Sequence, residues 1–224
     1  MKNPKIFIAC DTTSTKKTRQ IIKVSQKSKI IFGYKFGLEF LNSKNGRKFL
    51  SNQKNIITFG DYKLADIPNT CVSTLRAVKD LKLNYITIHI SSGLKAIKAV
   101  KKASGATKIV GVTILTSLDN KSLKEIGFDK NVKKLVTHQA KLAVKAKLDA
   151  IVCSPQEVKL VKKIFKKEII TPGIRLAGDS KGDQRRVMTP KQAFQNGATS
   201  LVMGRSLIKG KIEQNIKKLV KELS

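Results

Sequence analysis

Short apolar runs rich in β-branched residues alternate with amphipathic segments along the whole chain. Runs of this kind predict buried β-strands. They occur at residues 5–10, 30–36, 55–61, 85–90, 108–115, 150–153, 169–171 and 200–203. Between them, apolar residues recur at helical spacing. The clearest examples are Val132, Leu135, Val136, Ala140, Ala143 and Val144, and then Ile212, Ile216, Leu219 and Val220.

This alternation of strands and helices continues without a Pro-, Gly- or Ser-rich linker. Eight βα units in 224 residues predict one α/β domain over residues 1–224, folded as a (β/α)8 TIM barrel. A doubly wound sheet is the alternative, but no predicted strand is followed by G-x-G-x-x-G. In a barrel, reactive side chains are expected where strands end and the following loops begin.

The charge balance is strongly basic, with 46 Lys+Arg against 15 Asp+Glu and a formal net charge of +31. Such a charge raises the possibility of a nucleic-acid partner. However, all but seven of the cations are Lys, they fall on the polar faces of predicted helices, and the chain has no Trp. Nucleic-acid readers favour Arg and exposed aromatics. We therefore expect a solvated Lys-rich surface and no specific nucleic-acid partner. The alternative, a basic nucleic-acid-binding protein, would show a steep salt dependence of DNA affinity.

No apolar run approaches the roughly 18 residues that a membrane span needs. The apolar block before Asp11 is too short for a signal-peptide core, so a cytoplasmic location without a membrane partner is expected. Cys10, Cys71 and Cys153 are far apart and form no C-x-x-C pair. This spacing favours small buried thiols over a disulfide framework or a zinc site.

Charged residues gather at the ends of the second and third predicted strands. Asp61 and Lys63 would project to the same side of an extended strand, and Asp66 follows in the loop. Charges inside a barrel are costly unless they pair, so Lys35 is expected to join them in a network of alternating sign. Such a network keeps Lys63 cationic and able to donate a proton to carbon. A surface turn with ordinary salt bridges is the alternative.

A second cluster follows the seventh and eighth predicted strands. Residues 171–175 read T-P-G-I-R, and Gly204-Arg205 follows the last strand. Loops at these two places often form a phosphate site in this barrel, using backbone N–H groups and a cation. Arg175 and Arg205 are two of only seven arginines, which predicts a phosphorylated substrate rather than a purely structural loop with surface arginines.

Together these motifs resemble the orotidine 5'-phosphate decarboxylase family over essentially the whole chain. The resemblance is carried by Asp11 after the first strand, Lys35 on the second, D-x-K-x-x-D-I-P-N-T at 61–70, L-T-S at 115–117, T-P-G-I-R at 171–175, G-D-Q-x-R at 182–186 and G-R at 204–205. D-x-K-x-x-D alone also occurs in related phosphate-sugar decarboxylases. Ala65 departs from the family, in which many members have His.

The resemblance implies a cofactor-free and metal-free conversion of orotidine 5'-monophosphate to UMP and CO2 in pyrimidine biosynthesis. Lys63 would donate the proton to C6, and Asp61 would lie against the leaving carboxylate. Lys35 would hold the ribose hydroxyls and orient Asp61, while Asp11 would contact the ribose.

The same resemblance implies the remaining substrate contacts. Thr116 would meet the pyrimidine, and Gln184 would bridge base and phosphate. The phosphate end would be formed by Arg175, Gly204 and Arg205. The loop at 178–183 would close over the substrate.

The family also implies a homodimer. Its D-I-P-N-T segment reaches into the site of the neighbouring subunit, so Asp66, Ile67 and Thr70 would act across the interface. Two shared sites follow from this arrangement.

The nearest rival is a Mg²⁺-dependent sibling enzyme of the same barrel, such as a hexulose-phosphate synthase. It needs a further acidic metal ligand near the second strand, where the chain offers only Glu39. EDTA would abolish activity in the rival alone. Of the two histidines, His89 is interpreted as structural and His138 as lying on the solvent side of a helix.

Overall fold

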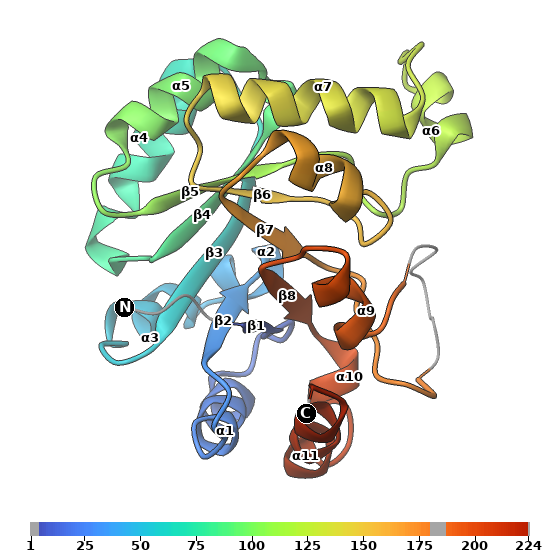
Figure 1. Ribbon diagram of the computed structural model, residues 1–224. Helices are drawn as coiled ribbons and strands as arrows, with labels where there is room; N and C mark the ends of the chain where they lie inside the picture. Colours follow the sequence, from blue (N-terminus) through green and yellow to red (C-terminus); the bar gives the residue numbers. More distant parts are fainter. Residues whose placement is uncertain (1–4, 180–186, 224) are drawn as a thin grey trace.

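A computed structural model describes residues 5–179 and 187–223. Its eight strands are all parallel and close in sequence order from β1 to β8, with β8 pairing back to β1 (Figure 1). The helices surround this closed sheet; α4, α5 and α7 lie on one side of it and α1 and α11 on the other. The fold is therefore the predicted (β/α)8 barrel, and closure excludes the open doubly wound sheet.

The strands are β1 (Ile6–Ala9), β2 (Phe32–Phe36), β3 (Ile57–Leu64), β4 (Tyr85–His89), β5 (Lys108–Val112), β6 (Ala150–Val152), β7 (Glu168–Thr171) and β8 (Ser200–Met203). The longer helices are α1 (Thr15–Ser25), α4 (Pro68–Ala77), α5 (Gly93–Ala103), α7 (Val132–Lys145), α8 (Val158–Ile164) and α11 (Ile212–Leu223). The short ones are α2 (Leu38–Leu41), α3 (Gly46–Ser51), α6 (Asn120–Glu125), α9 (Pro190–Gln195) and α10 (Arg205–Ile208), with 3-10 turns η1 (Lys79–Leu81) and η2 (Ile90–Ser92).

Each predicted strand overlaps an observed one, and the largest differences are at the carboxyl ends of β5 and β3. β5 ends at Val112 and not at residue 115. The apolar Ile114 suggested a longer strand, but its side chain is instead buried beside a pocket at the barrel mouth. β3 runs past Asp61 to Leu64. The charged residues of β3 therefore belong to the strand itself.

Side-chain alternation divides the apolar residues into two layers. Phe7, Phe59 and Tyr85 point into the barrel, and the Phe7 ring lies 5.0 Å from Phe59 and 5.1 Å from Tyr85 between centroids. Their neighbours along each strand, such as Ile6 and Ile8, pack outward in the larger core with the helices. The interior of the barrel is thus filled below its mouth.

Helix α7 buries most of its predicted stripe, but Val144 was assigned to it wrongly and is 47% exposed. The buried positions end with Ala140 and Ala143, and the next residue turns by about 100° toward solvent. His138 is exposed on this helix, as predicted.

Gly60 allows two side chains to pack closely against the third strand. A Cβ atom at this position would lie 2.7 Å from Leu83 Cδ1 and 2.8 Å from Tyr62 Cε2. The missing side chain leaves room for Leu83 and Tyr62 to pack against the strand.

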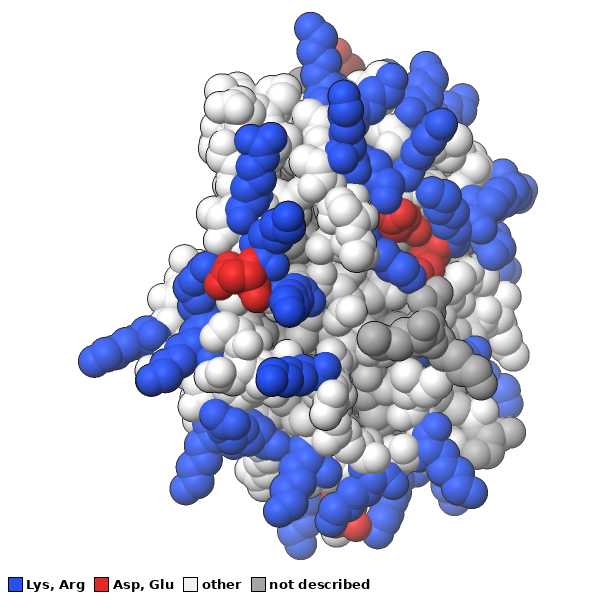
Figure 2. Space-filling view, turned by 90° about the vertical axis from the view of Figure 1, so that its left-hand side faces the viewer, with Lys and Arg blue, Asp and Glu red and all other residues white. Residues whose placement is uncertain are grey.

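The Lys-rich composition is distributed over the surface. Figure 2 shows cationic side chains spread around the periphery of one face, with the few acidic side chains between them. Within residues 5–179 and 187–223, every helix is too short or too polar to cross a lipid bilayer. All three cysteines are free and buried, as predicted.

A polar network lies at the opposite end of the barrel from its mouth. The Glu168 carboxylate, at the first residue of β7, accepts a hydrogen bond from the Tyr85 hydroxyl at 3.1 Å and forms an ion pair with Lys108. Tyr85 and Lys108 begin β4 and β5. Because Glu168 is only 9% exposed, these partners offset the cost of burying its carboxylate.

Replacing Glu168 by Ala should destabilise the protein by about 2 kcal/mol, because it removes the carboxylate that accepts from the Tyr85 hydroxyl and pairs with Lys108. Thermal unfolding should show a Tm lower by roughly 4–8 °C. Glu213→Ala is the control, since the exposed Glu213–Lys217 pair should contribute under about 0.5 kcal/mol. Equal Tm values for the two variants would contradict a stabilising role of the network.

Candidate functional site

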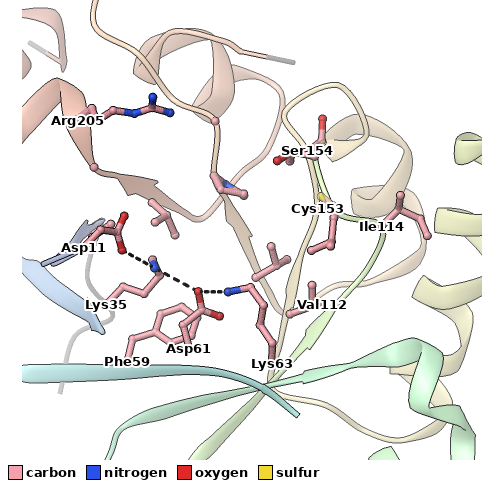
Figure 3. Close-up of a pocket in the computed structure, with 18 residues that line it drawn as sticks. Asp11, Lys35, Phe59, Asp61, Lys63, Val112, Ile114, Cys153, Ser154 and Arg205 are labelled. Carbon is pink, nitrogen blue, oxygen red and sulfur yellow. Dashed lines mark hydrogen bonds and ion pairs between the residues drawn. The ribbon is translucent and has the colours of Figure 1, made fainter. Parts of the chain in front are cut away.

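A pocket of about 270 Å³ opens at the carboxyl ends of the strands (Figure 3). It is lined by Ala9, Asp11, Lys35, Phe59, Asp61, Lys63, Val112, Ile114, Leu115, Thr116, Val152, Cys153, Ser154, Pro172, Gly173, Val202, Gly204 and Arg205. Charged groups come from β1, β2, β3 and the end of β8, while β5 and β6 contribute apolar walls. The wall formed by β5 and β6 is therefore apolar, and the charged groups lie elsewhere around the pocket.

Four side chains form a row of alternating charge along this pocket. Lys35 Nζ lies 3.4 Å from Asp11 Oδ1 and 3.2 Å from Asp61 Oδ2. Lys63 Nζ donates to the same Asp61 oxygen at 2.7 Å. Figure 3 shows the row running from Asp11 to Lys63, as predicted for Lys35, Asp61 and Lys63.

The row offsets the cost of burying its central members. Burial alone would raise the pKa of Asp61, which is 7% exposed, but Lys35 and Lys63 outweigh it and hold the pKa below its ordinary value. Burial alone would lower the pKa of Lys35, yet Asp61 and Asp11 together raise it. Asp61 is consequently an anion and Lys35 a cation at neutral pH.

The backbone of β3 departs from the predicted extended strand at Lys63. Its φ is +48°, and the pairing with β4 moves from Gly60–Ile86 directly to Leu64–Ile88. This bulge places more residues on β3 than on β4 between the two pairs. Asp61 and Lys63 do meet on one side, but the bulge and not simple alternation brings them together.

Buried Thr87 joins the two residues from the neighbouring strand. Its Oγ1 accepts a hydrogen bond from Lys63 N at 2.7 Å and donates one to Asp61 Oδ1 at 3.0 Å. The sequence analysis missed Thr87. The sequence pattern that could have indicated Thr87 is the alternation in β4. Its polar residues Thr87 and His89 follow Tyr85 at every second position and so share the inward face.

The predicted phosphate end lies on the far side of the pocket. Arg205 lies across the pocket from Lys63, and Gly204 lines the wall beside it (Figure 3). Arg205 also lines an adjoining hollow together with Arg175 and Gly178. Thr116 lines the main pocket. Gln184, with most of the loop at 178–183, lies outside the described residues.

The segment after β3 does not reach the pocket of its own chain. Asp66 and Thr70 are exposed, and Ile67 is 66% exposed. The Asp66 carboxylate accepts a hydrogen bond from the next backbone N–H, at Ile67. Within one chain, therefore, the fourth member of the row is Asp11, which contacts Lys35, and the predicted Asp66 does not join it.

The remaining polar candidates lie at the edge of the site. His89 is half-buried and does not line the pocket; burial, followed by the Lys63 charge, lowers its pKa. Cys153 and Ser154 line the pocket at the end of β6. Glu39 is exposed on α2 and does not line it. Over residues 5–179 and 187–223, no three His, Cys, Asp or Glu side chains are grouped to hold a metal ion.

Known proteins resemble this chain along nearly its full length. A family model described as "Orotidine 5'-phosphate decarboxylase / HUMPS family" matches residues 4–218. An orotidine 5'-phosphate decarboxylase of Prochlorococcus marinus is 40% identical, with 92% of this chain and 89% of the relative covered. One of Erythrobacter litoralis is 39% identical, with 93% of each covered. The crystal structure of the Lactobacillus acidophilus enzyme of that name has a TM-score of 0.83 and 27% identity, covering 99% of this chain and 100% of the other.

Proposed function

The chain belongs to the orotidine 5'-phosphate decarboxylase / HUMPS family, and we propose that its pocket decarboxylates without a cofactor, with Lys63 as the proton donor to C6. The activity is that of an orotidine 5'-phosphate decarboxylase, a carboxy-lyase of pyrimidine biosynthesis. Its substrate is orotidine 5'-monophosphate and its product is UMP. The observation that carries the proposed mechanism is the Asp61–Lys63 pair facing the pocket, in which the carboxylate is buried.

The chemistry requires a cation at the reacting carbon. When the bond between C6 and the carboxyl group breaks, its electron pair stays on C6 and CO2 leaves. The resulting carbanion has no attached electron sink, so a preorganised cation must stabilise it. Lys63 supplies that charge and then transfers a proton to C6, which yields UMP. Its neutral amine regains a proton from water.

Asp61 and Lys35 would prepare this step. The Asp61 carboxylate holds the Lys63 ammonium at 2.7 Å and would place a negative charge beside the substrate carboxylate, which is lost in the transition state. Lys35 fixes Asp61 from its other side and, with Asp11, would contact the ribose hydroxyls. These two residues therefore link sugar recognition to the orientation of the reacting groups.

The far side of the pocket would hold the phosphate. Arg205, Gly204 and Arg175 offer guanidinium and backbone groups there, and Thr116 would meet the pyrimidine. Gln184 would bridge the base and the phosphate. Binding energy from the phosphate would orient C6 against Lys63.

We also infer that the enzyme is a homodimer whose sites are shared. Support comes from Asp66, Ile67 and Thr70, which project outward at the start of α4 instead of entering their own pocket. An isoleucine exposed to 66% beside a carboxylate and a hydroxyl suits insertion into a partner subunit. Asp66 would then complete the charge network around Lys63 of the neighbouring chain. Because its three thiols are free and buried, we place the enzyme in a reducing compartment, the cytoplasm.

In excess EDTA, purified protein should consume orotidine 5'-monophosphate at the same rate as without chelator. The reason is that a lysine and not a metal supplies the positive charge. The reaction is measured as the loss of substrate absorbance. Abolition of turnover by EDTA, with recovery on addition of Mg²⁺, would favour the chemistry of the metal-dependent siblings. Absence of turnover in both buffers would contradict the decarboxylase assignment.

A further inference from the structure

Thr87 lies inside the barrel between the Asp61 carboxylate and the backbone of Lys63. It is fully buried on β4 and faces inward between Tyr85 and His89. Its hydroxyl accepts from Lys63 N at 2.7 Å, so its single proton is directed to Asp61 Oδ1 at 3.0 Å. One neutral hydroxyl therefore connects the two groups that the proposed chemistry needs.

On one side, Thr87 supports the bulge of β3. A left-handed conformation is unfavourable for a residue other than glycine, and Lys63 adopts one with φ of +48°. The register with β4 is interrupted between Gly60 and Leu64, so the Lys63 N–H needs an acceptor outside a regular ladder. The Thr87 hydroxyl provides it.

On the other side, Thr87 fixes the plane of the Asp61 carboxylate. Lys35 and Lys63 both contact Oδ2, whereas Thr87 holds Oδ1. With partners on both oxygens, rotation of the carboxylate about its Cβ–Cγ bond would break at least one contact. Without Thr87 the Oδ1 atom would lose this constraint.

We propose that Thr87 is a positioning residue for the decarboxylation, holding Asp61 and the Lys63 backbone in the geometry from which the proton is delivered. The proposal rests on the roles of Asp61 and Lys63 given above. Thr87 does not line the pocket, so it acts through these two residues and not by touching the substrate. Its loss should therefore lower kcat much more than it raises KM.

The test compares Thr87→Val, which keeps the shape but removes the hydroxyl, with Thr87→Ser, which keeps the hydroxyl. For Thr87→Val we expect kcat to fall about 10- to 100-fold, the effect of a lost hydrogen bond to a charged group, with KM and the Kd of UMP within about threefold of wild type. Thr87→Ser should retain kcat within about threefold. Removing a hydrogen-bond donor to the Asp61 carboxylate should raise its pKa. The acidic limb of the pH profile of kcat should therefore move to higher pH in Thr87→Val.

Thr58 offers a matched control on β3. It is also a buried threonine, and its hydroxyl donates to Asn84 Oδ1 at 3.1 Å and accepts from Asn84 N at 3.2 Å. Thr58→Val thus removes the same kinds of hydrogen bond away from the pocket. It should lower Tm about as much as Thr87→Val and leave kcat unchanged.

Three results would overturn the proposal: a kcat within twofold of wild type for Thr87→Val, an equal fall in Thr87→Ser, or an equal fall in Thr58→Val. If Thr87→Val does not fold, Thr87→Cys replaces it, because a thiol is similar in size but a weak donor; the same three criteria apply. Wild-type protein is assayed in parallel. Absence of wild-type turnover would count against the decarboxylase function. With normal wild-type turnover, any of the three results would count only against the proposed role of Thr87.

Discussion

The Lys63→Ala protein should fold and bind UMP but lose about 10⁴-fold or more of kcat, because the substitution removes both the proton donor and the cation that faces the carbanion. Lys63 is the end of the charged row, and its Nζ is held 2.7 Å from Asp61 Oδ2. Nothing else in the row can replace it, since the other cation, Lys35, already lies between Asp11 and Asp61. The measurement is steady-state decarboxylation, with the Kd of UMP measured separately.

The control for this experiment is Lys98→Ala, which removes an exposed lysine from α5 and should leave kcat unchanged. Near-normal UMP affinity in Lys63→Ala would show that the loss is in the chemical step. If Lys63→Ala retained more than about one percent of kcat, the proton would have to come from another group, and the proposed role of Lys63 would be wrong.

The sequence carried enough information to predict the barrel and the charged residues that line the pocket. Charges such as those of Asp61 and Lys63 are costly in a buried strand unless they are paired, so the pairing of Asp61 with both Lys35 and Lys63 followed from that cost. The place of Arg205 followed from the position of its loop after β8. These features depend on local pattern and on the order of the strands.

Features that depend on contacts between strands could not be predicted in the same way. A period of two along β3 contains no sign that Lys63 is left-handed or that β3 has extra residues opposite β4 at this point. Thr87 was visible as a polar residue in an apolar strand, but only the β3–β4 register shows that it contacts Asp61. The place of Asp66 is a further step away, because its own chain leaves it in solvent.

Replacing that exposed residue, Asp66, by Ala should lower kcat at least about 10²-fold, because the shared-site proposal places it beside Lys63 of the partner subunit. A surface carboxylate in a monomeric site would have no such effect. Asp80→Ala provides the comparison, since Asp80 is also exposed and pairs with Arg47 on the surface. That variant should keep wild-type kcat.

Mixing the two inactive proteins, Lys63→Ala and Asp66→Ala, separates a shared site from an ordinary one. If each site takes Lys63 from one subunit and Asp66 from the other, a hybrid dimer has one site with both substitutions and one with neither. Random exchange of equal amounts makes half the dimers hybrid, so about a quarter of all sites should become active. Activity should appear with time as subunits exchange, and size-exclusion chromatography should show dimers throughout. A mixture no more active than its two components would place Asp66 and Lys63 in the same chain's site or Asp66 outside the site altogether, and the shared-site arrangement would be wrong.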